Sequence, residues 1–434
     1  MSNSQKKVFI VIIIGILAVL AILCLLVMNN RKHDPNEVII PLTPIAKLQN
    51  AQVTKTAMAN EPLVPTRASA ALELMSTGSQ IVTSKQNGQK ERIATVSPNT
   101  GVPITSQIDN RPKSLVPVEV KGLYMTGWIA GIPSRRNKLI SLIDRTELNA
   151  VVLDVKDDEG QLTGDDMGIT LAQQIKASYH KANLPDVLEA FRQHNIYPIA
   201  RIVCFKDTLL AMKRPDLAVK TSNGNVWRDR RGAPWVDPYN QEVWKYNIDI
   251  AKAAARLGFR EIQFDYVRFV SDGNIATAIY PNKTGSKEDN ILNFLNYAKK
   301  ELAPYNVFIS ADVFGLTTSV PDDLQIGQKF EKVSSSVNYI CPMVYPSHYY
   351  PGTYGIANPN ANPYDTVHNS MIRAVKKTRG AIIRPWLQDF SLGAPIYTAT
   401  HVIAQKKAVY AAGLKEWILW NPQNKYQEGA LAHE

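Results

Sequence analysis

The chain has 434 residues, of which 45% are hydrophobic, and it carries a formal net charge of +11. This length fits one large domain or two ordinary ones, and the hydrophobic content is typical of a globular chain with a full core. Three scattered cysteines exclude a disulfide framework, and no CxxC or HExxH spacing indicates a zinc site. The positive net charge would attract nucleic acid, anionic lipid and anionic polymers alike, so it does not identify the binding partner.

Residues 8–28 form an apolar run that contains a single glycine, Gly15. Its length is close to the ~20 residues that a helix needs to cross the hydrocarbon core of a bilayer. A cleaved signal peptide is the alternative, but the run is long for one and its end lacks an A-x-A-like site. Leu23 stands before Cys24 where a lipid-attachment motif has a small residue, which argues against lipidation. We therefore predict an uncleaved transmembrane helix.

The charges around this run indicate its orientation. Lys6 and Lys7 precede it and favour a cytoplasmic N-terminal tail, although Arg31 and Lys32 on the other side weaken that preference. We predict that residues 1–33 form a short tail and a single-pass anchor in the cell membrane, with the rest of the chain outside the cytoplasm.

Residues 34–117 are rich in Ser, Thr, Gln, Asn, Ala and Pro and show no sustained apolar period. Such a composition does not bury enough apolar surface to fold alone. We predict a flexible linker that holds the following domain away from the membrane.

From residue 118 onward, short β-branched and aromatic runs alternate with segments of helical period, which is typical of parallel βα units. Eight such runs occur, at residues 120–128, 150–155, 197–205, 261–269, 307–314, 337–345, 381–387 and 416–420. Eight strands close a (β/α)8, or TIM, barrel, and we predict this α/β fold over residues 118–434. A doubly wound sheet uses the same unit, but no GxGxxG or GxxxxGK[ST] motif opens a helix, which argues against its nucleotide-binding forms.

The active site of a TIM barrel lies at the C-terminal ends of the strands, so polar and aromatic residues at those ends are candidates. We predict three catalytic carboxylates, which are Asp265, Asp312 and Asp389. We predict twelve substrate-binding residues, which are Asp154, Asp157, Arg201, Lys206, Gln263, Tyr266, Arg268, Tyr345, His348, Trp386, Gln388 and Trp420.

Strand alternation selects one pair of carboxylates. In IQFDYVRF, Gln263 and Asp265 share one face, and in FISADVF, Ser310 and Asp312 share one face. Adjacent strands lie ~4.8 Å apart, so the two carboxyls would approach closely. Glycoside hydrolysis uses such a pair, with a separation of ~5–5.5 Å favouring retention and ~6.5–9.5 Å favouring inversion. Asp389, across the barrel, remains a rival partner for either geometry.

A structural alternative applies to each inward Asp. Inward charges are almost never left unpaired, so each of these carboxylates would form a buried ion pair with Arg201, Lys156 or Lys121. Sugar binding also needs flat apolar faces, and five tryptophans lie at strand ends or in the following loops: Trp128, Trp227, Trp235, Trp386 and Trp420. Any one of them alone is better explained as core.

Several motifs together are similar to the putative glycosyl hydrolase domain family of bacterial secreted and membrane-anchored proteins. The motifs are KGLYMTGW, NAVVLDVKDDEG, YPIARIVCFKD, PWVDPYNQEVWKYNIDIAKAAARLGFREIQFDYVRF, ISADVFG, YICPMVYPSHY and RPWLQDF. The resemblance covers residue 121 to the C-terminus and implies a TIM barrel with a carbohydrate-active site. It places site residues at Asp154, Asp265, Asp312, Tyr345 and Asp389. A chitinase-type fourth strand is also distantly similar, but Val267 stands where that motif has its acidic Glu, which puts N-acetyl-assisted chemistry in doubt.

These observations favour a glycoside hydrolase that acts on a cell-surface or extracellular polysaccharide, with no cofactor, no resident metal and no nucleic-acid partner. One alternative is a barrel that binds polysaccharide without cleaving it, because fold does not guarantee function. Another is a metal-assisted deacetylase that uses Asp154, Asp157 and His348, although no His pair supports it.

Overall fold

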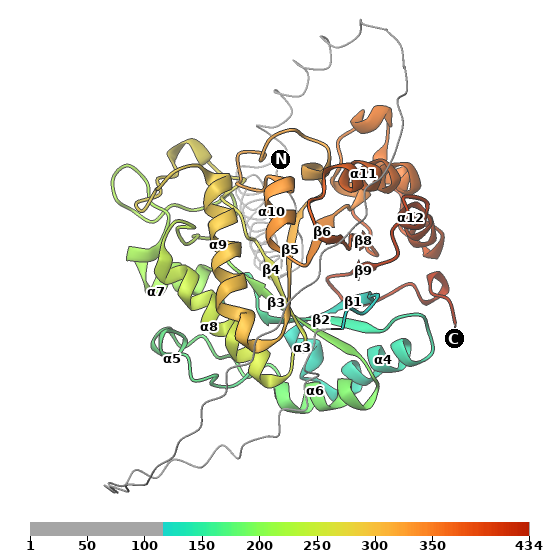
Figure 1. Cartoon of the computed structure of the whole chain (residues 1–434), viewed down its shortest axis with the longest axis horizontal. Coiled ribbons are helices and arrows are strands. Elements are labelled where there is room, and N and C mark those ends of the chain that lie inside the picture. The colour runs from blue at the N-terminus through green and yellow to red at the C-terminus, as the bar shows by residue number, and fades with distance from the viewer. Residues whose placement is uncertain (1–115, 434) are drawn as a thin grey trace, which may run out of the picture. The chain divides into compact units, whose positions relative to one another are not determined.

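The computed structural model describes residues 116–433, so the predicted anchor and the predicted linker up to residue 115 lie outside the described part (Figure 1). The strands are β1 (Lys121–Met125), β2 (Ala150–Lys156), β3 (Tyr197–Val203), β4 (Glu261–Asp265), β5 (Phe308–Phe314), β6 (Tyr339–Met343), β7 (Ile382–Ile383), β8 (Trp386–Gln388) and β9 (Trp417–Trp420). They form one sheet in the order β5-β4-β3-β2-β1-β9-β8-β6-β7, and a further pairing of β5 with β6 closes it. All of the pairings are parallel, which confirms the predicted barrel.

The seventh position of the barrel holds two short strands, β7 and β8, which both pair with β6. Arg384 and Pro385 separate them. Proline has no N–H to donate to a neighbouring strand, which explains why the ladder breaks here. The carbonyl of Pro385 still accepts from the N–H of Ile418 on β9 at 3.0 Å, so the barrel wall continues across the break.

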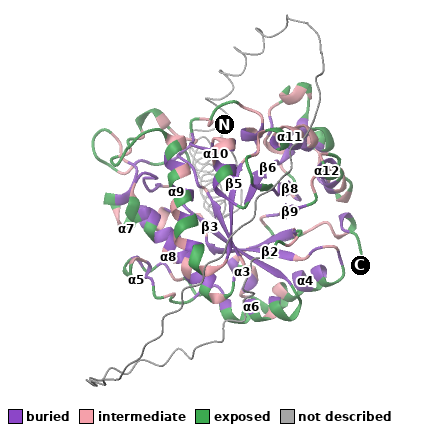
Figure 2. Ribbon diagram, viewed as in Figure 1, coloured by how far each residue is buried: buried purple, intermediate pink, exposed green. Residues whose placement is uncertain are grey.

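Helices surround the barrel. They are α3 (Gly127–Ala130), α4 (Pro133–Asp144), α5 (Thr170–Ile175), α6 (Leu184–Gln193), α7 (Thr208–Lys213), α8 (Gln241–Leu257), α9 (Lys287–Leu302), α10 (Phe330–Ser336), α11 (Pro363–Lys377) and α12 (Ala399–Ala411). Figure 2 shows buried residues along the strands and exposed residues on the outer sides of the helices. Within residues 116–433, no helix is both long enough and apolar enough to span a bilayer.

The helix α8 illustrates how the sequence sets these elements. The side chain of Asn240 caps its start by accepting from the backbone N–H of Glu242 at 2.8 Å. Val243, Ile250 and Ala254 recur at helical spacing and are fully buried against the barrel. The helix ends at Gly258, whose φ of 114° is a left-handed conformation that glycine adopts without strain.

Strand alternation divides the core into two layers. Side chains inside the barrel form one cluster, which includes Tyr124, Val152, Ile199, Phe308, Tyr339, Trp386 and Ile418. The opposite faces of the strands pack on the helices and form a second, larger cluster. At the N-terminal ends of the strands the interior holds Arg384, which is fully buried and bonds Glu261 at 2.8 Å and Glu416 at 2.7 Å.

Four strands, β1, β3, β4 and β6, end earlier than the apolar runs predicted, and β1 and β4 show why. The run at 120–128 continues past β1, but Thr126 caps α3 by accepting from the N–H of Ile129 at 3.2 Å, so a helical turn begins there. The run at 261–269 continues past β4, but Tyr266 adopts a φ of 48° and turns the chain out of the sheet. In both places one backbone feature overrides a continuous apolar pattern.

Candidate active site

Arg201 on β3 organises the C-terminal end of the barrel. Its Nη1 contacts Asp154 Oδ1 at 2.5 Å, and its Nη2 contacts Asp265 Oδ2 at 2.6 Å, with Nε donating to the same oxygen at 2.9 Å. Asp154 and Asp265 come from the neighbouring strands β2 and β4, and all three residues are buried. Asp154 and Asp265 therefore form the buried ion pairs that the structural alternative predicted, and Arg201 is the cation that they share.

The other two predicted cations pair elsewhere. Lys156 contacts Asp207 at 2.8 Å, and Lys121 contacts Glu147 at 3.2 Å. The second oxygen of Asp154 accepts instead from the hydroxyl of Tyr124. Burial raises the pKa of Asp154 in spite of the adjacent guanidinium.

The backbone next to Asp265 is strained. Tyr266 has a φ of 48°, which is unusual for a bulky residue. This conformation directs its backbone N–H to Asp265 Oδ1 at 2.5 Å. Asp265 thus has one oxygen held by Arg201 and the other held by a main-chain N–H. Strain of this kind at a polar strand end is consistent with a functional position.

Asp312 on β5 lies in a different environment. Gln263 pairs with Ser310 and Phe264 with Ala311 in the β4–β5 register, which brings Asp265 and Asp312 next to each other on the inner face. Asp312 is 1% exposed, its Oδ1 accepts from Trp386 Nε1 at 2.7 Å, and its Oδ2 has no hydrogen-bond partner among the described residues. Burial, followed by the charge of Asp265, raises its pKa well above the usual value. This shift favours the protonated form of Asp312.

Below this pair the interior remains polar. Gln263 Nε2 donates to Cys341 Sγ at 3.2 Å, while Gln263 Oε1 and Ser310 Oγ have no partner within residues 116–433. This arrangement agrees with the prediction that Gln263 and Asp265 share the inner face of β4 and that Ser310 and Asp312 share the inner face of β5.

Aromatic rings line the β1, β8 and β9 side of the same space. Tyr124 stacks on Trp420 with 4.0 Å between ring centroids, and Trp386 meets Trp420 edge-on at 5.5 Å. The guanidinium of Arg201 lies 5.4 Å from the Trp420 ring. Trp386 is buried and Trp420 is half-buried, so Trp420 presents more of its surface for a ligand.

The ends of β6 and β8 are joined above the barrel. Gln388 accepts from the N–H of Ser347 and donates to the carbonyl of Phe390, both at 3.0 Å. Tyr345 packs against the rings of His348 and Phe390 at 5.3 and 5.5 Å. Burial lowers the pKa of His348 to about 4, so its imidazole is neutral at neutral pH.

Asp389 lies apart from the carboxylate pair. It follows the end of β8, where its Oδ2 accepts from the backbone N–H of Gln427 at 2.9 Å and the side chain of Asn421 donates to its carbonyl. Burial raises its pKa to about 7. Within the described residues, no hydrogen bond or ion pair joins it to Arg201. The structure thus brings Asp265 and Asp312 together and places Asp389 against the C-terminal segment, where its catalytic role stays a prediction.

Four predicted binding residues lie on loops beyond the strand ends. Asp157 contacts Lys181 at 2.5 Å, and Lys206 contacts Asp158 at 2.5 Å. The Lys206 ammonium also lies 5.1 Å from the Tyr266 ring. The guanidinium of Arg268 is packed between rings, 4.9 Å from Trp235 and 4.6 Å from Phe314. Their binding roles stay predictions.

Tyr124 is a site residue that the sequence analysis did not select. Its hydroxyl contacts Asp154 and its ring covers Trp420. The signal was present in KGLYM, because Tyr124 shares a strand face with Gly122 and lies one residue before the end of β1. Tyr124 points into the barrel, although the run that contains it is otherwise apolar and offers no charged residue as a marker.

The three residues of the deacetylase alternative are not gathered into a metal site. Asp154 is bound by Arg201, Asp157 is bound by Lys181, and His348 packs on Tyr345. Across residues 116–433, no cluster of three or more His, Cys, Asp or Glu side chains has an arrangement that would hold a metal ion.

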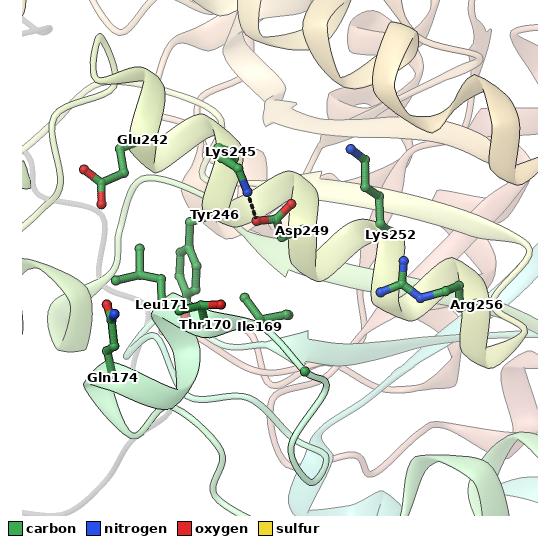
Figure 3. A pocket seen from close by; sticks show the side chains of 11 residues that line it. Ile169, Thr170, Leu171, Gln174, Glu242, Lys245, Tyr246, Asp249, Lys252 and Arg256 are labelled. Carbon is green, nitrogen blue, oxygen red and sulfur yellow. Dashed lines mark hydrogen bonds and ion pairs between the residues drawn. The ribbon is translucent and has the colours of Figure 1, made fainter. Parts of the chain in front are cut away.

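A cavity of about 490 Å³ lies outside the barrel, between α5 and α8 (Figure 3). Its charged lining residues are already paired, since Lys245 contacts Asp249 and Lys252 contacts Glu301, both at 2.5 Å. None of the carboxylates at the barrel end lines this cavity. The candidate active site is therefore at the C-terminal ends of the barrel strands and not in this cavity.

A closed parallel barrel with paired carboxyls at the C-terminal ends of its strands defines a TIM-barrel protein with the architecture of glycoside hydrolases. The family model "Putative glycosyl hydrolase domain" matches residues 122–426, and the chain belongs to this family. We found no match among curated protein sequences.

Several solved structures are similar. The PgaB (BpsB) glycoside hydrolase domain from Bordetella bronchiseptica is 12% identical with a TM-score of 0.53, and the match covers 70% of this chain and 94% of that one. A hypothetical protein from Ruminiclostridium thermocellum is 43% identical with a TM-score of 0.42, over 44% of this chain and 97% of that one. The Bacillus megaterium spore cortex-lytic enzyme SleL is 12% identical with a TM-score of 0.45, over 73% of this chain and 74% of that one.

Proposed function

We propose that this protein is a glycoside hydrolase that cleaves a cell-surface or extracellular polysaccharide, with Asp312 as the general acid and Asp265 as the nucleophile. The observation that carries the proposal is the different environment of two neighbouring inward carboxyls. Asp265 forms an ion pair with Arg201, while Asp312 is buried, forms no ion pair within residues 116–433 and has a raised pKa. Glycoside hydrolysis requires one ionised and one protonated carboxyl, and environments that separate two pKa values identify such pairs.

The proposed reaction retains the configuration at the anomeric carbon. Asp312 gives its proton to the glycosidic oxygen as the C–O bond breaks, and the Asp265 carboxylate bonds to the anomeric carbon. Asp312 then takes a proton from water, which attacks the same carbon and releases Asp265. Neighbouring positions on adjacent strands support the short separation, ~5–5.5 Å, that retention requires.

The remaining residues have supporting roles in this proposal. Arg201 holds the Asp265 carboxylate in place, and the stacked rings of Tyr124 and Trp420 offer a flat surface for a sugar. The polar layer of Gln263 and Ser310 offers hydrogen-bonding groups beneath the reacting carbon. Membership of a glycosyl hydrolase family supports a carbohydrate substrate.

The test is reducing-sugar release by the purified full-length chain from a panel of bacterial wall polysaccharides and exopolysaccharides. Asp265→Asn keeps the shape of the side chain but removes the nucleophile, and we expect release to fall to background. Asp365→Asn alters an exposed carboxylate in the first turn of α11 and should leave release unchanged. Binding of a polymer by wild type without any release would instead support the polysaccharide-binding barrel.

We also propose that residues 1–33 anchor the protein in the membrane, that residues 34–117 act as a linker, and that the barrel over residues 118–434 works outside the cytoplasm. The apolar run at 8–28 and the polar composition after it support this arrangement. Protease added to intact cells should cleave the barrel from the membrane fraction. Protection of the barrel until the cells are lysed would contradict the proposed orientation.

A further inference from the structure

Trp128 differs from the other tryptophans of the chain. All seven lie in the described residues, and Trp128 is 58% exposed while the other six are buried or half-buried. It lies in α3, directly after β1 and four residues beyond Tyr124. A single exposed ring needs no explanation, but the surroundings of this ring are specific.

A second exposed ring lies near the same ammonium group. Tyr179 is 41% exposed, and the Nζ of Lys181 lies 5.3 Å from the Trp128 ring and 5.8 Å from the Tyr179 ring. Lys181 is itself buried and is held by Asp157 at 2.5 Å, while Asp157 accepts from the N–H of Gln161 at 2.9 Å. The ammonium therefore orders both rings, and its own charge is already neutralised.

The backbone also holds the two rings in place. An added Cβ at Gly127 would lie 2.2 Å from Thr163 Oγ1, and one at Gly131 would lie 1.7 Å from the carbonyl oxygen of Lys181. Thus α3 packs directly on the segment that carries Tyr179. That segment is bonded in turn, because the N–H of Tyr179 donates to the carbonyl of Leu162 at 3.1 Å. The rings are positioned before any ligand arrives, which lowers the entropic cost of binding.

We propose that Trp128 and Tyr179 form a stacking subsite for gluco-configured pyranose rings of a polysaccharide chain that leads into the carboxylate site. This inference rests on the proposed function. The axial C–H bonds of such sugars make flat apolar faces that pack on aromatic rings, while Lys181 and Asp157 border the rings with polar atoms.

The size and place of the surface favour a sugar chain as occupant. Two aromatic side chains offer roughly 150–250 Å² each, well short of the ~800 Å² per partner of a stable protein interface. The elements that carry the two rings are also connected to those of the candidate active site. Thr163 Oγ1 donates to the carbonyl of Asp154 at 2.6 Å, and β1 carries Tyr124 just before α3. A chain held at the carboxylates would pass over this side of the barrel end.

The experiment measures binding separately from cleavage. Affinity electrophoresis of the full-length chain in detergent, in gels that contain hydroxyethyl cellulose, glycol chitin or laminarin, gives an apparent Kd for each polymer. We expect Trp128→Ala to weaken binding about tenfold or more and Trp128→Phe to keep most of it. Tyr410→Ala removes a ring at the C-terminal end of α12 that is 41% exposed, as Tyr179 is, and serves as the control, with unchanged binding expected.

A second readout does not depend on any variant. N-bromosuccinimide oxidises exposed tryptophan, so Trp128 should be the most reactive tryptophan, and bound polymer should protect it in peptide mass spectrometry. Equal oxidation with and without polymer, equal binding by Trp128→Ala, or no binding of any polymer by wild type would overturn the subsite. Polymer protection of Trp128 in a wild-type protein that releases no sugar would contradict the hydrolase and leave the subsite standing.

Discussion

Asp265 and Asp312 are the same type of residue on the same inner surface, yet their surroundings differ. Arg201 and a backbone N–H bond the carboxylate of Asp265, whereas burial and the neighbouring charge of Asp265 raise the pKa of Asp312. This difference is what a proton donor beside a nucleophile requires.

Asp312→Asn tests the proton donor. Asparagine keeps the shape of the side chain but does not protonate the leaving oxygen, so kcat on polysaccharide should fall about 10²–10⁴-fold. Substrates with an acidic aryl leaving group need less protonation and should lose less activity. In wild type, activity should decline as the pH rises through the elevated pKa of Asp312, and this basic limb should disappear in the variant. An unchanged basic limb would assign the proton transfer to another group.

The buried carboxyl of Asp389 allows a separate test, which is how its raised pKa makes the stability of the fold depend on pH. Its pKa of about 7 lies above the ordinary value of 3.8 because of burial. Between pH 4 and 7 the unfolded chain loses this proton while the folded chain keeps it. The free energy of unfolding of wild type should therefore fall by on the order of 4 kcal/mol across that window, and Asp389→Asn should lack this component.

The measurement is chemical denaturation of both proteins at pH 4, 5.5, 7 and 8. Relative to wild type, Asp389→Asn should be more stable at pH 8 than at pH 4, because its amide does not ionise and its carbonyl oxygen can still accept from Gln427. A difference between the two proteins that stays constant with pH would contradict the elevated pKa.

At the scale of elements, the strands could be predicted because buried parallel strands are continuous apolar runs. The ends of the strands could not be predicted in this way. Thr126 caps a helical turn inside one run, Tyr266 turns the chain inside another, and Pro385 divides a third. Each of these is a local backbone feature that hydrophobic pattern does not report.

The candidate site was predictable to a similar extent. Alternation placed Asp265 and Asp312 on inner faces, because the side-chain period of a strand is two. The partners of Arg201 were left open, because they depend on the register between β2, β3 and β4, which no single strand contains. Asp389 follows a strand end, where alternation no longer applies, and the structure places it against Gln427.

The packing of α3 on its neighbouring segment is an element-scale feature with a direct test. Gly131 has an ordinary φ of −76°, so Gly131→Ala adds no backbone strain and acts only through the contact of its Cβ with the Lys181 carbonyl. We expect a loss of about 1–3 kcal/mol in the free energy of unfolding, as for other overpacked sites. Gly429→Ala, whose Cβ would meet Ala399 at an ordinary 3.6 Å, is the control for thermal and denaturant unfolding. Equal stability of the two variants would show that α3 shifts at little cost.

On the scale of the whole molecule, the two ends of the barrel interior use charge differently. At the C-terminal end of the strands, one oxygen of Asp312 has no hydrogen-bond partner in the described part of the chain, and Trp420 is partly exposed. At the opposite end, Arg384 is fully enclosed between Glu261 and Glu416 and lies 3.8 Å from the Tyr339 ring. This second network joins β4 to the β7–β9 side through the interior, so it holds the barrel closed beneath the site.

Arg384→Met tests that role. The substitution leaves both Glu261 and Glu416 buried without a cation, and breaking a buried pair in this way typically costs about 3–5 kcal/mol of stability. Adding Glu261→Met and Glu416→Met together should recover most of the loss, because well-packed apolar side chains often replace a buried ion pair without cost. Arg145→Met breaks an exposed pair with Glu428 and should leave the free energy of unfolding nearly unchanged, because solvent screens exposed charges. If denaturation shows Arg384→Met to be as mild as Arg145→Met, the barrel is closed by its backbone pairing and apolar packing rather than by this network.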